Sequence, residues 1–195
     1  MELDRKQYNI LKEKYGKVAS WLIYYDDYGN HEKNYKLIER SIDILNPKYV
    51  FCGLNAACHT MKVWEAFHVK YQGGKGKLLR DTFNASRVFR GAYVTDIIKE
   101  HVDPKSNNVR DKIKKNGINI GHNIKIFCQE MDDLRVNGTY PIVYAFGWDA
   151  YNIIAQSDIN KLYSVEYIVH YSMPGLSNED FKLAIREKEK LIWKK

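Results

Sequence analysis

The 195-residue sequence has no long apolar run, because nowhere do about 18 apolar residues follow one another. A membrane-spanning helix is therefore not expected. Residues 1–5 also lack the apolar core of a secretory signal peptide, and we expect a cytoplasmic protein. The glycine-rich segment 72–76 follows no strand-like stretch and has no Lys-Ser or Lys-Thr ending, so a phosphate-binding loop is not expected.

Cysteine is scarce and follows no pattern. The three cysteines, Cys52, Cys58 and Cys128, form no Cys-x-x-Cys pair. Cys52 falls in a strand-like stretch and Cys128 in a helical one, so both are expected to be ordinary buried thiols. His59 follows Cys58, but no further ligands stand at metal-site spacing. We expect no metal, no iron–sulfur cluster and no other cofactor.

Acidic residues are fewer than basic ones, with 24 Asp and Glu against 31 Lys and Arg. The formal net charge is +7, and hydrophobic residues make up 45% of the chain, which is enough for a packed core. A basic balance favours a polyanionic partner such as nucleic acid. A lysine-rich composition with no functional meaning would give the same charge, and the count alone does not separate the two.

Residues 49–57, Tyr-Val-Phe-Cys-Gly-Leu-Asn-Ala-Ala, form the stretch around which the chain is organised. Apolar residues run without interruption into Gly53, as in a strand buried on both faces. Similar strand-like stretches follow at 91–95, 141–147 and 164–170. These four stretches are the predicted strands.

Apolar residues at helical spacing predict helices around these strands. The expected helical segments are 3–28 (Tyr8, Leu11, Tyr15, Val18 and Leu22), 31–45, 60–86 (two helices around a loop, the first with Val63, Trp64 and Phe67), 120–134, a segment from Trp148, and one from Ser177. The polar segment 102–117 is assigned no helix. Ser177 with Asp180 resembles a capping box at the start of the last helix.

Alternating strands and helices predict a parallel sheet with right-handed crossovers. We therefore expect one α/β domain over residues 1–195, a three-layer α/β/α sandwich with a central four-stranded parallel sheet. Residues 1–46 would be N-terminal helices packing on the sheet, and residues 48–178 would form the core that carries the motifs.

Polar side chains stand where the predicted strands end. Because parallel strands share one carboxyl edge, Asn55, Asp96 and His170 should converge on one crevice, beside Gly53 and Gly147. Each residue alone is as compatible with a structural role. Together they favour a pocket for a small molecule or a nucleobase.

Four segments resemble the uracil-DNA glycosylase superfamily. Residues 53–57, Gly-Leu-Asn-Ala-Ala, are similar to its first motif, closest to the Gly-x-Asn-Pro-Gly form of the mismatch-specific and single-strand-selective branches. Residues 170–177, His-Tyr-Ser-Met-Pro-Gly-Leu-Ser, resemble the second motif. Residues 92–99 and 145–150 resemble the strand-to-helix segment and the glycine turn between them. The likeness covers about residues 48–178, in the family's order.

The resemblance implies a DNA base-excision glycosylase that flips a damaged or mismatched base and hydrolyses its N-glycosidic bond. Asn55 would position the attacking water, and His170 would donate a hydrogen bond to the departing base. Gly53, Leu54 and Asp96 would line the base pocket. Either Phe67 or Trp64 could stack on the base, although both also fit a core role.

The resemblance also implies contacts with DNA from the second motif. Leu176 would be the wedge that fills the gap left by the flipped base. Ser172, Gly175 and Ser177 would contact the DNA strand, with helix capping as the alternative role of Ser177. The implied partner is DNA, bound by a monomer, and rim lysines and arginines would make the affinity salt-sensitive.

Three positions depart from the family pattern. Ala56 and Tyr171 replace prolines that follow the motif asparagine and histidine. Asp96 stands where several branches place an asparagine that reads uracil. An ionised carboxylate only accepts hydrogen bonds, so Asp96 would suit a base that presents N–H groups, unless it is protonated.

Two other functions stay open. The chain would be a catalytically inactive member of this superfamily, acting as a nucleic-acid or protein-binding module, if the altered motifs have lost activity. It would be a nucleoside or nucleotide hydrolase of another α/β family if the likeness is limited to the fold. The sequence has no phosphate loop and no acidic metal cluster in favour of that last reading.

Overall fold

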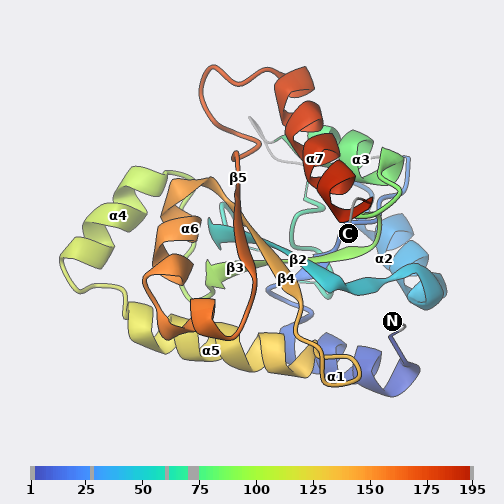
Figure 1. Cartoon of the computed structure of the whole chain (residues 1–195), viewed down its shortest axis with the longest axis horizontal. Helices are drawn as coiled ribbons and strands as arrows, with labels where there is room; N and C mark the ends of the chain where they lie inside the picture. Colours follow the sequence, from blue (N-terminus) through green and yellow to red (C-terminus); the bar gives the residue numbers. More distant parts are fainter. Residues whose placement is uncertain (1–2, 27–28, 60–61, 70–74, 194–195) are drawn as a thin grey trace.

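The computed structural model describes residues 3–26, 29–59, 62–69 and 75–193. Its centre is a five-stranded mixed sheet with the strand order β1-β3-β2-β4-β5 (Figure 1). The parallel strands are β2 (Asn46–Asn55), β3 (Ala92–Ile98), β4 (Ile142–Phe146) and β5 (Val165–Ile168), and β1 (Ser20–Trp21) runs antiparallel to β3.

The predicted sheet of four parallel strands is therefore incomplete, because a fifth strand covers one edge. Ser20 pairs with Val94 and Trp21 with Tyr93. A strand of two residues has no alternation that a sequence pattern could reveal, and its backbone bonds to β3 define it. Covering the outer edge of β3 in this way satisfies backbone groups that an open edge would expose.

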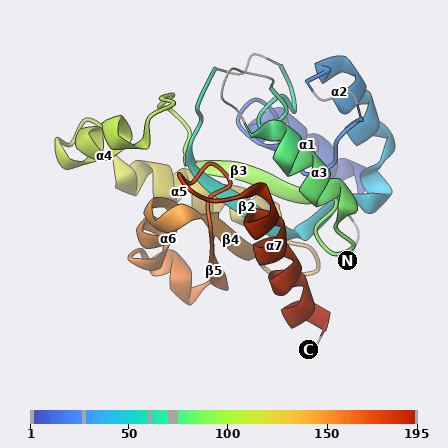
Figure 2. The same cartoon turned by 90° about the horizontal axis from the view of Figure 1, so that it is seen from above.

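Helices lie on both faces of the sheet (Figures 1 and 2). The first apolar core joins the strands to helices on one face, and the second joins them to α3 and α7 on the other. The α-helices are α1 (Arg5–Tyr15), α2 (His31–Arg40), α3 (Gly76–Ala85), α4 (Ser106–Lys114), α5 (Ile120–Asp133), α6 (Gly147–Ala155) and α7 (Asn178–Trp193). Two short 3₁₀ helices, Ile42–Ile44 and Asp158–Lys161, complete the described elements.

Successive side chains along each strand point alternately into the two cores. In β2, Val50 and Cys52 point into the first core, while Tyr49 and Phe51 point into the second. Continuing this period of two places Gly53 and Asn55 on the side of Tyr49 and Phe51. Both residues lie inside β2, where Gly53 pairs with Asp96 of β3. We had expected Asn55 to lie just past the end of the strand, but it is the last residue of β2.

Three helix predictions need correction. The first helix ends at Tyr15, so the helical spacing of Val18 and Leu22 was fortuitous. Residues 62–69 form turns and no helix, with positive φ angles at Trp64 (58°) and Phe67 (64°). The unassigned polar segment contains α4, whose sole buried residue is Val109, too little for an apolar stripe. Residues 72–74 of the predicted glycine-rich loop lie outside the described residues, and Gly76 begins α3.

Over the described ranges, the structure contains no helix that is both long and apolar enough to cross a bilayer.

Candidate functional site

A cleft of about 560 Å³ lies at the carboxyl edge of the sheet. The ends of β2, β3 and β4 and the segment after β5 all contribute to it. The structure brings the following predicted site residues to this cleft: Gly53, Leu54, Asn55, Phe67, Asp96, His170 and Ser172. Residues from three layers of the fold therefore surround one space.

The Asn55 side chain is held by two carbonyl groups. Its amide nitrogen donates hydrogen bonds of 2.9 Å each to the main-chain oxygens of Ala56 and Asp103. These bonds use both amide protons and fix the side chain across the gap between β2 and the loop before α4. No donor in the described part of the chain contacts Oδ1 of Asn55, so this oxygen remains an acceptor at the cleft.

The His170 ring is a neutral donor. The main-chain N–H of Ser172 donates to Nδ1 of His170 over 3.1 Å, so Nδ1 carries no proton and the ring proton resides on Nε2. Burial lowers the pKa of His170 to about 4, and the nearby Asp149 opposes this only in part. Tyr171 stacks on the ring at a centroid distance of 4.4 Å, which restricts its orientation.

The turn from β4 to α6 leaves room for this histidine. Gly147 has a φ of +82°, which L side chains rarely adopt, and a Cβ there would lie 3.3 Å from Cβ of His170. Glycine thus serves both the conformation of the turn and the close approach of His170.

The Asp96 carboxyl group lies directly above Gly53. Any Cβ at residue 53 would collide with Oδ1 of Asp96, so the absence of a side chain makes space for the carboxyl group. Asp96 is 6% exposed. Burial raises its pKa to about 7, while Lys99 opposes the shift and Glu130 adds to it.

The sequence did not predict a pair of stacked aromatic side chains, Trp148 and Tyr167, at the mouth of the cleft. Trp148 stacks on Tyr167 with ring centroids 4.1 Å apart, and 59% of Trp148 is exposed. Arg110 reaches the same region and pairs with both carboxylate oxygens of Asp149. Trp148 follows the glycine of a strand-to-helix turn, and that position was the available signal. No sequence signal pointed to Arg110, because its helix, α4, was not predicted.

Several predicted site residues lie elsewhere. Trp64 is fully buried and donates its indole N–H to the Tyr8 hydroxyl over 2.8 Å, so it belongs to the core and not to the base pocket. Leu176 packs against the second core, whereas Met173, 50% exposed, lines the cleft. Periodicity does not distinguish such positions, because irregular backbone decides which side chain turns inward.

Ser177 and Gly175 are also outside the lining of the cleft. Ser177 Oγ accepts from the Asp180 N–H and donates to the Asp180 carboxylate, which is the expected helix cap. A carboxylate at 2.7 Å repels a phosphate, so the alternative DNA-contacting role of Ser177 is disfavoured. Gly175 is an exposed loop residue with a φ of +78°.

Metal ligands do not gather in the described structure. No group of three or more His, Cys, Asp or Glu side chains within the described ranges could hold a metal ion. Burial raises the pKa of the Cys58 thiol, which lines the cleft in its neutral form.

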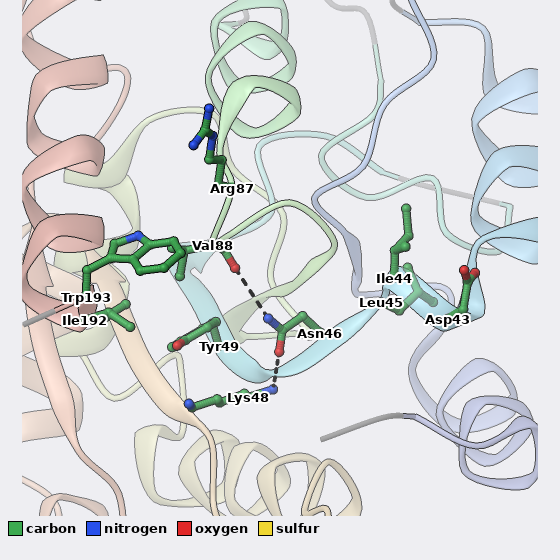
Figure 3. A pocket seen from close by; sticks show the side chains of 10 residues that line it. All are labelled: Asp43, Ile44, Leu45, Asn46, Lys48, Tyr49, Arg87, Val88, Ile192 and Trp193. Carbon is green, nitrogen blue, oxygen red and sulfur yellow. Dashed lines mark hydrogen bonds between the residues drawn. The ribbon is translucent and has the colours of Figure 1, made fainter. Parts of the chain in front are cut away.

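A second hollow of about 410 Å³ lies at the opposite edge of the sheet, where β2 begins (Figure 3). Its central polar side chain, Asn46, donates to the Val88 carbonyl and accepts from the Lys48 N–H, so both ends of the amide are engaged. The remaining lining combines apolar and aromatic residues such as Tyr49 and Trp193 with the charged residues Asp43, Lys48 and Arg87. The carboxyl-edge cleft therefore has the chemically richer lining.

Comparison of the chain with family models, curated proteins and solved structures gives no match. Functional inference thus depends on the geometry of the cleft and on the motifs within the chain.

Proposed function

We propose that the protein is a DNA base-excision glycosylase, with the uracil-DNA glycosylase architecture, that hydrolyses the N-glycosidic bond of a flipped base. One observation carries the proposal: a fixed amide oxygen, Oδ1 of Asn55, and a neutral N–H donor, Nε2 of His170, belong to side chains that line one cleft. The resemblance of residues 53–57 and 170–177 to the superfamily motifs supports the same reaction.

Asn55 orients the nucleophile in this mechanism. Its Oδ1 accepts a hydrogen bond from a water molecule and directs the water oxygen toward the sugar C1′. The bond between C1′ and the base nitrogen breaks, and its electron pair leaves with the base. The water oxygen bonds to C1′, one water proton passes to solvent, and the base anion later takes up a proton from solvent.

His170 stabilises the leaving group. As a neutral Nε2–H donor, it forms a hydrogen bond to a base oxygen on which negative charge develops. Donors held in place before the reaction lower the barrier by roughly 3–4 kcal/mol in enzymes generally. Low basicity suits this role, because the histidine is neutral throughout the physiological pH range.

DNA contacts come from the rim. Met173 replaces Leu176 as the candidate wedge, because it is a long, exposed apolar side chain in the loop that borders the cleft. Trp148, stacked on Tyr167, offers its ring to a neighbouring base. Lys75 adds positive charge for the phosphates, whereas the charge of Arg110 is already compensated by Asp149.

The test is single-turnover cleavage of end-labelled oligonucleotides that carry uracil, mismatched thymine, hypoxanthine or xanthine, in single and double strands. We expect Asn55→Ala and His170→Ala each to reduce the rate at least a hundredfold. Asn152→Ala and His122→Ala remove exposed side chains outside the cleft and should leave the rate unchanged.

The outcome separates the proposal from its alternative. Salt-dependent DNA binding with no cleavage of any substrate would contradict the glycosylase and favour a non-catalytic DNA-binding module. Equal rates in the parent and in Asn55→Ala or His170→Ala would remove those residues from the mechanism.

A further inference from the structure

The Asp96 side chain lines the cleft and is almost fully buried. It is 6% exposed, and no hydrogen bond to its side chain exists among the described residues. Lys99 lies close by, but its ammonium group donates to the main-chain oxygen of Asp96, to Thr95 and, as an ion pair, to Glu130. Nothing in the described fold thus uses the two carboxyl oxygens.

A buried polar group without a partner costs free energy, and its retention calls for an explanation. Asp96 lines the cleft, and glycine at residue 53 makes room for its Oδ1. The Phe67 ring also lies beside Gly53, with Cζ 3.9 Å from where a Cβ would stand. An aromatic ring next to an unpaired hydrogen-bonding group suits a planar heterocycle.

We propose that Asp96 reads the edge of the bound base and that its protonation state decides which edge fits. A carboxylic acid donates one hydrogen bond and accepts another, which matches a C=O beside a ring N–H, as in uracil, thymine and hypoxanthine. A carboxylate accepts two, which matches an amino group beside a ring N–H, as in guanine. This inference rests on the proposed function, because it assigns the substrate class of the same cleft.

The surroundings of Asp96 allow both forms near neutral pH. Burial raises its pKa to about 7, since water is lost around the carboxylate. Two charged groups act on its pKa: Lys99, which directly follows β3, favours the carboxylate, and Glu130 of α5 favours the acid. The nearby thiols of Cys52 and Cys58 have raised pKa values and stay neutral, so they add no charge.

The sign of the pH dependence follows from these forms. A base with a C=O and N–H edge binds only the acid, whose fraction falls as the pH rises through 7. Apparent affinity is reduced by that fraction, which gives a loss of about thirtyfold between pH 5.5 and 8.5. A base with two N–H groups shows the opposite trend.

The test measures binding apart from cleavage. The probe is a labelled single-stranded oligonucleotide with one 2′-fluorodeoxyuridine, whose glycosidic bond resists hydrolysis, and the reference is the same strand with a tetrahydrofuran abasic site. In the parent protein, the preference for the uracil strand should fall about thirtyfold over this pH range. Asp96→Asn should keep the preference at every pH, since an amide always donates and accepts. Asp132→Asn, at an exposed position on α5, should behave like the parent.

A second measurement follows the carboxyl group directly. The ¹³C shift of the Asp96 carboxyl carbon should titrate near pH 7, and the uracil strand should raise that midpoint, because it binds the acid. An unchanged midpoint, or equal pH dependence in the parent and Asp96→Asn, would overturn the inference. Base binding of the expected pH dependence without cleavage of any substrate would instead contradict the glycosylase and leave the role of Asp96 intact.

Discussion

Burial shifts the pKa values of two titratable side chains in the cleft in the direction that favours the neutral form. Burial removes water from both, and this penalises the charged form of each. The pKa of His170 falls to about 4, and that of Asp96 rises to about 7. The cleft therefore presents an uncharged N–H donor and a carboxyl group near its midpoint at neutral pH, a combination suited to reading an uncharged base.

The state of His170 is directly measurable. At pH 7, the ¹⁵N shifts of its ring should report a neutral imidazole with the proton on Nε2, since Nδ1 accepts from the Ser172 N–H. The midpoint should lie near pH 4, and the free energy of unfolding should fall as the pH drops from about 6.5 toward 4, because the unfolded chain binds the proton more readily. A midpoint near 6.5, or a proton on Nδ1, would contradict the assigned donor.

At the residue scale, the sequence predicted best where strand geometry determines position. Asn55, Asp96 and His170 meet because parallel strands end at one edge. Leu176 was wrongly predicted to stand at the mouth of the cleft, and Trp64 takes the core role that was its alternative, because both lie in irregular backbone whose direction depends on tertiary packing.

At the scale of elements, a buried ion pair joins α5 to β3. Nζ of Lys99 lies 2.6 Å from Oε2 of Glu130, and the two side chains are 6% and 0% exposed. Tyr93 and Thr95 of β3 donate to the other Glu130 oxygen. The pair fixes β3, the strand that carries Asp96, against α5 on the face of the sheet covered by the first core.

Breaking this pair should destabilise the fold. Lys99→Met leaves the Glu130 carboxylate buried without its cation, and we expect the free energy of unfolding to fall by about 3–5 kcal/mol in urea denaturation. Adding Glu130→Gln removes that charge and should restore part of the loss. Lys161→Met, in the exposed pair with Asp158, is the control and should leave the midpoint unchanged. A loss as small as that of the control would refute the structural role of the buried pair.

Element prediction followed how much apolar surface each element buries. The four parallel strands and α5 bury continuous apolar rows, and their sequences reveal them. The strand β1 is defined by pairing with β3, and α4 buries one residue, so neither has a pattern of its own. Trp64 and Phe67 adopt left-handed backbone conformations, but neither is a glycine, so the sequence did not mark a turn there.

At the scale of the whole molecule, the chain carries a formal net charge of +7. Lys17, Lys75 and Arg110 line the cleft at the edge where the strands end, together with the acidic residues Asp103 and Asp149, and Asp149 pairs with Arg110. Positive charge around a concave site attracts a polyanion and releases its counterions on binding. The net positive charge of the chain thus favours a polyanionic partner.

This arrangement predicts salt-dependent binding of single-stranded DNA. Lys75→Gln should reduce the slope of log affinity against log salt by about 0.7, the value for one phosphate contact on a single strand. Lys190→Gln, at an exposed position of α7 outside the cleft, should leave the slope unchanged. Equal slopes for the two variants would show that Lys75 in the cleft does not contact a DNA phosphate.

The central claim is that a water molecule attacks the sugar C1′ and releases the base. Its most direct test is incubation of the protein with uracil- and hypoxanthine-containing oligonucleotides in ¹⁸O-water at pH 6.5, with mass spectrometry of both products. We predict a free base without ¹⁸O and an abasic strand as the two products, and at least a hundredfold less of both with Asn55→Ala over the same time. Intact oligonucleotides after incubation with the folded parent protein, or ¹⁸O on the base, would contradict the account.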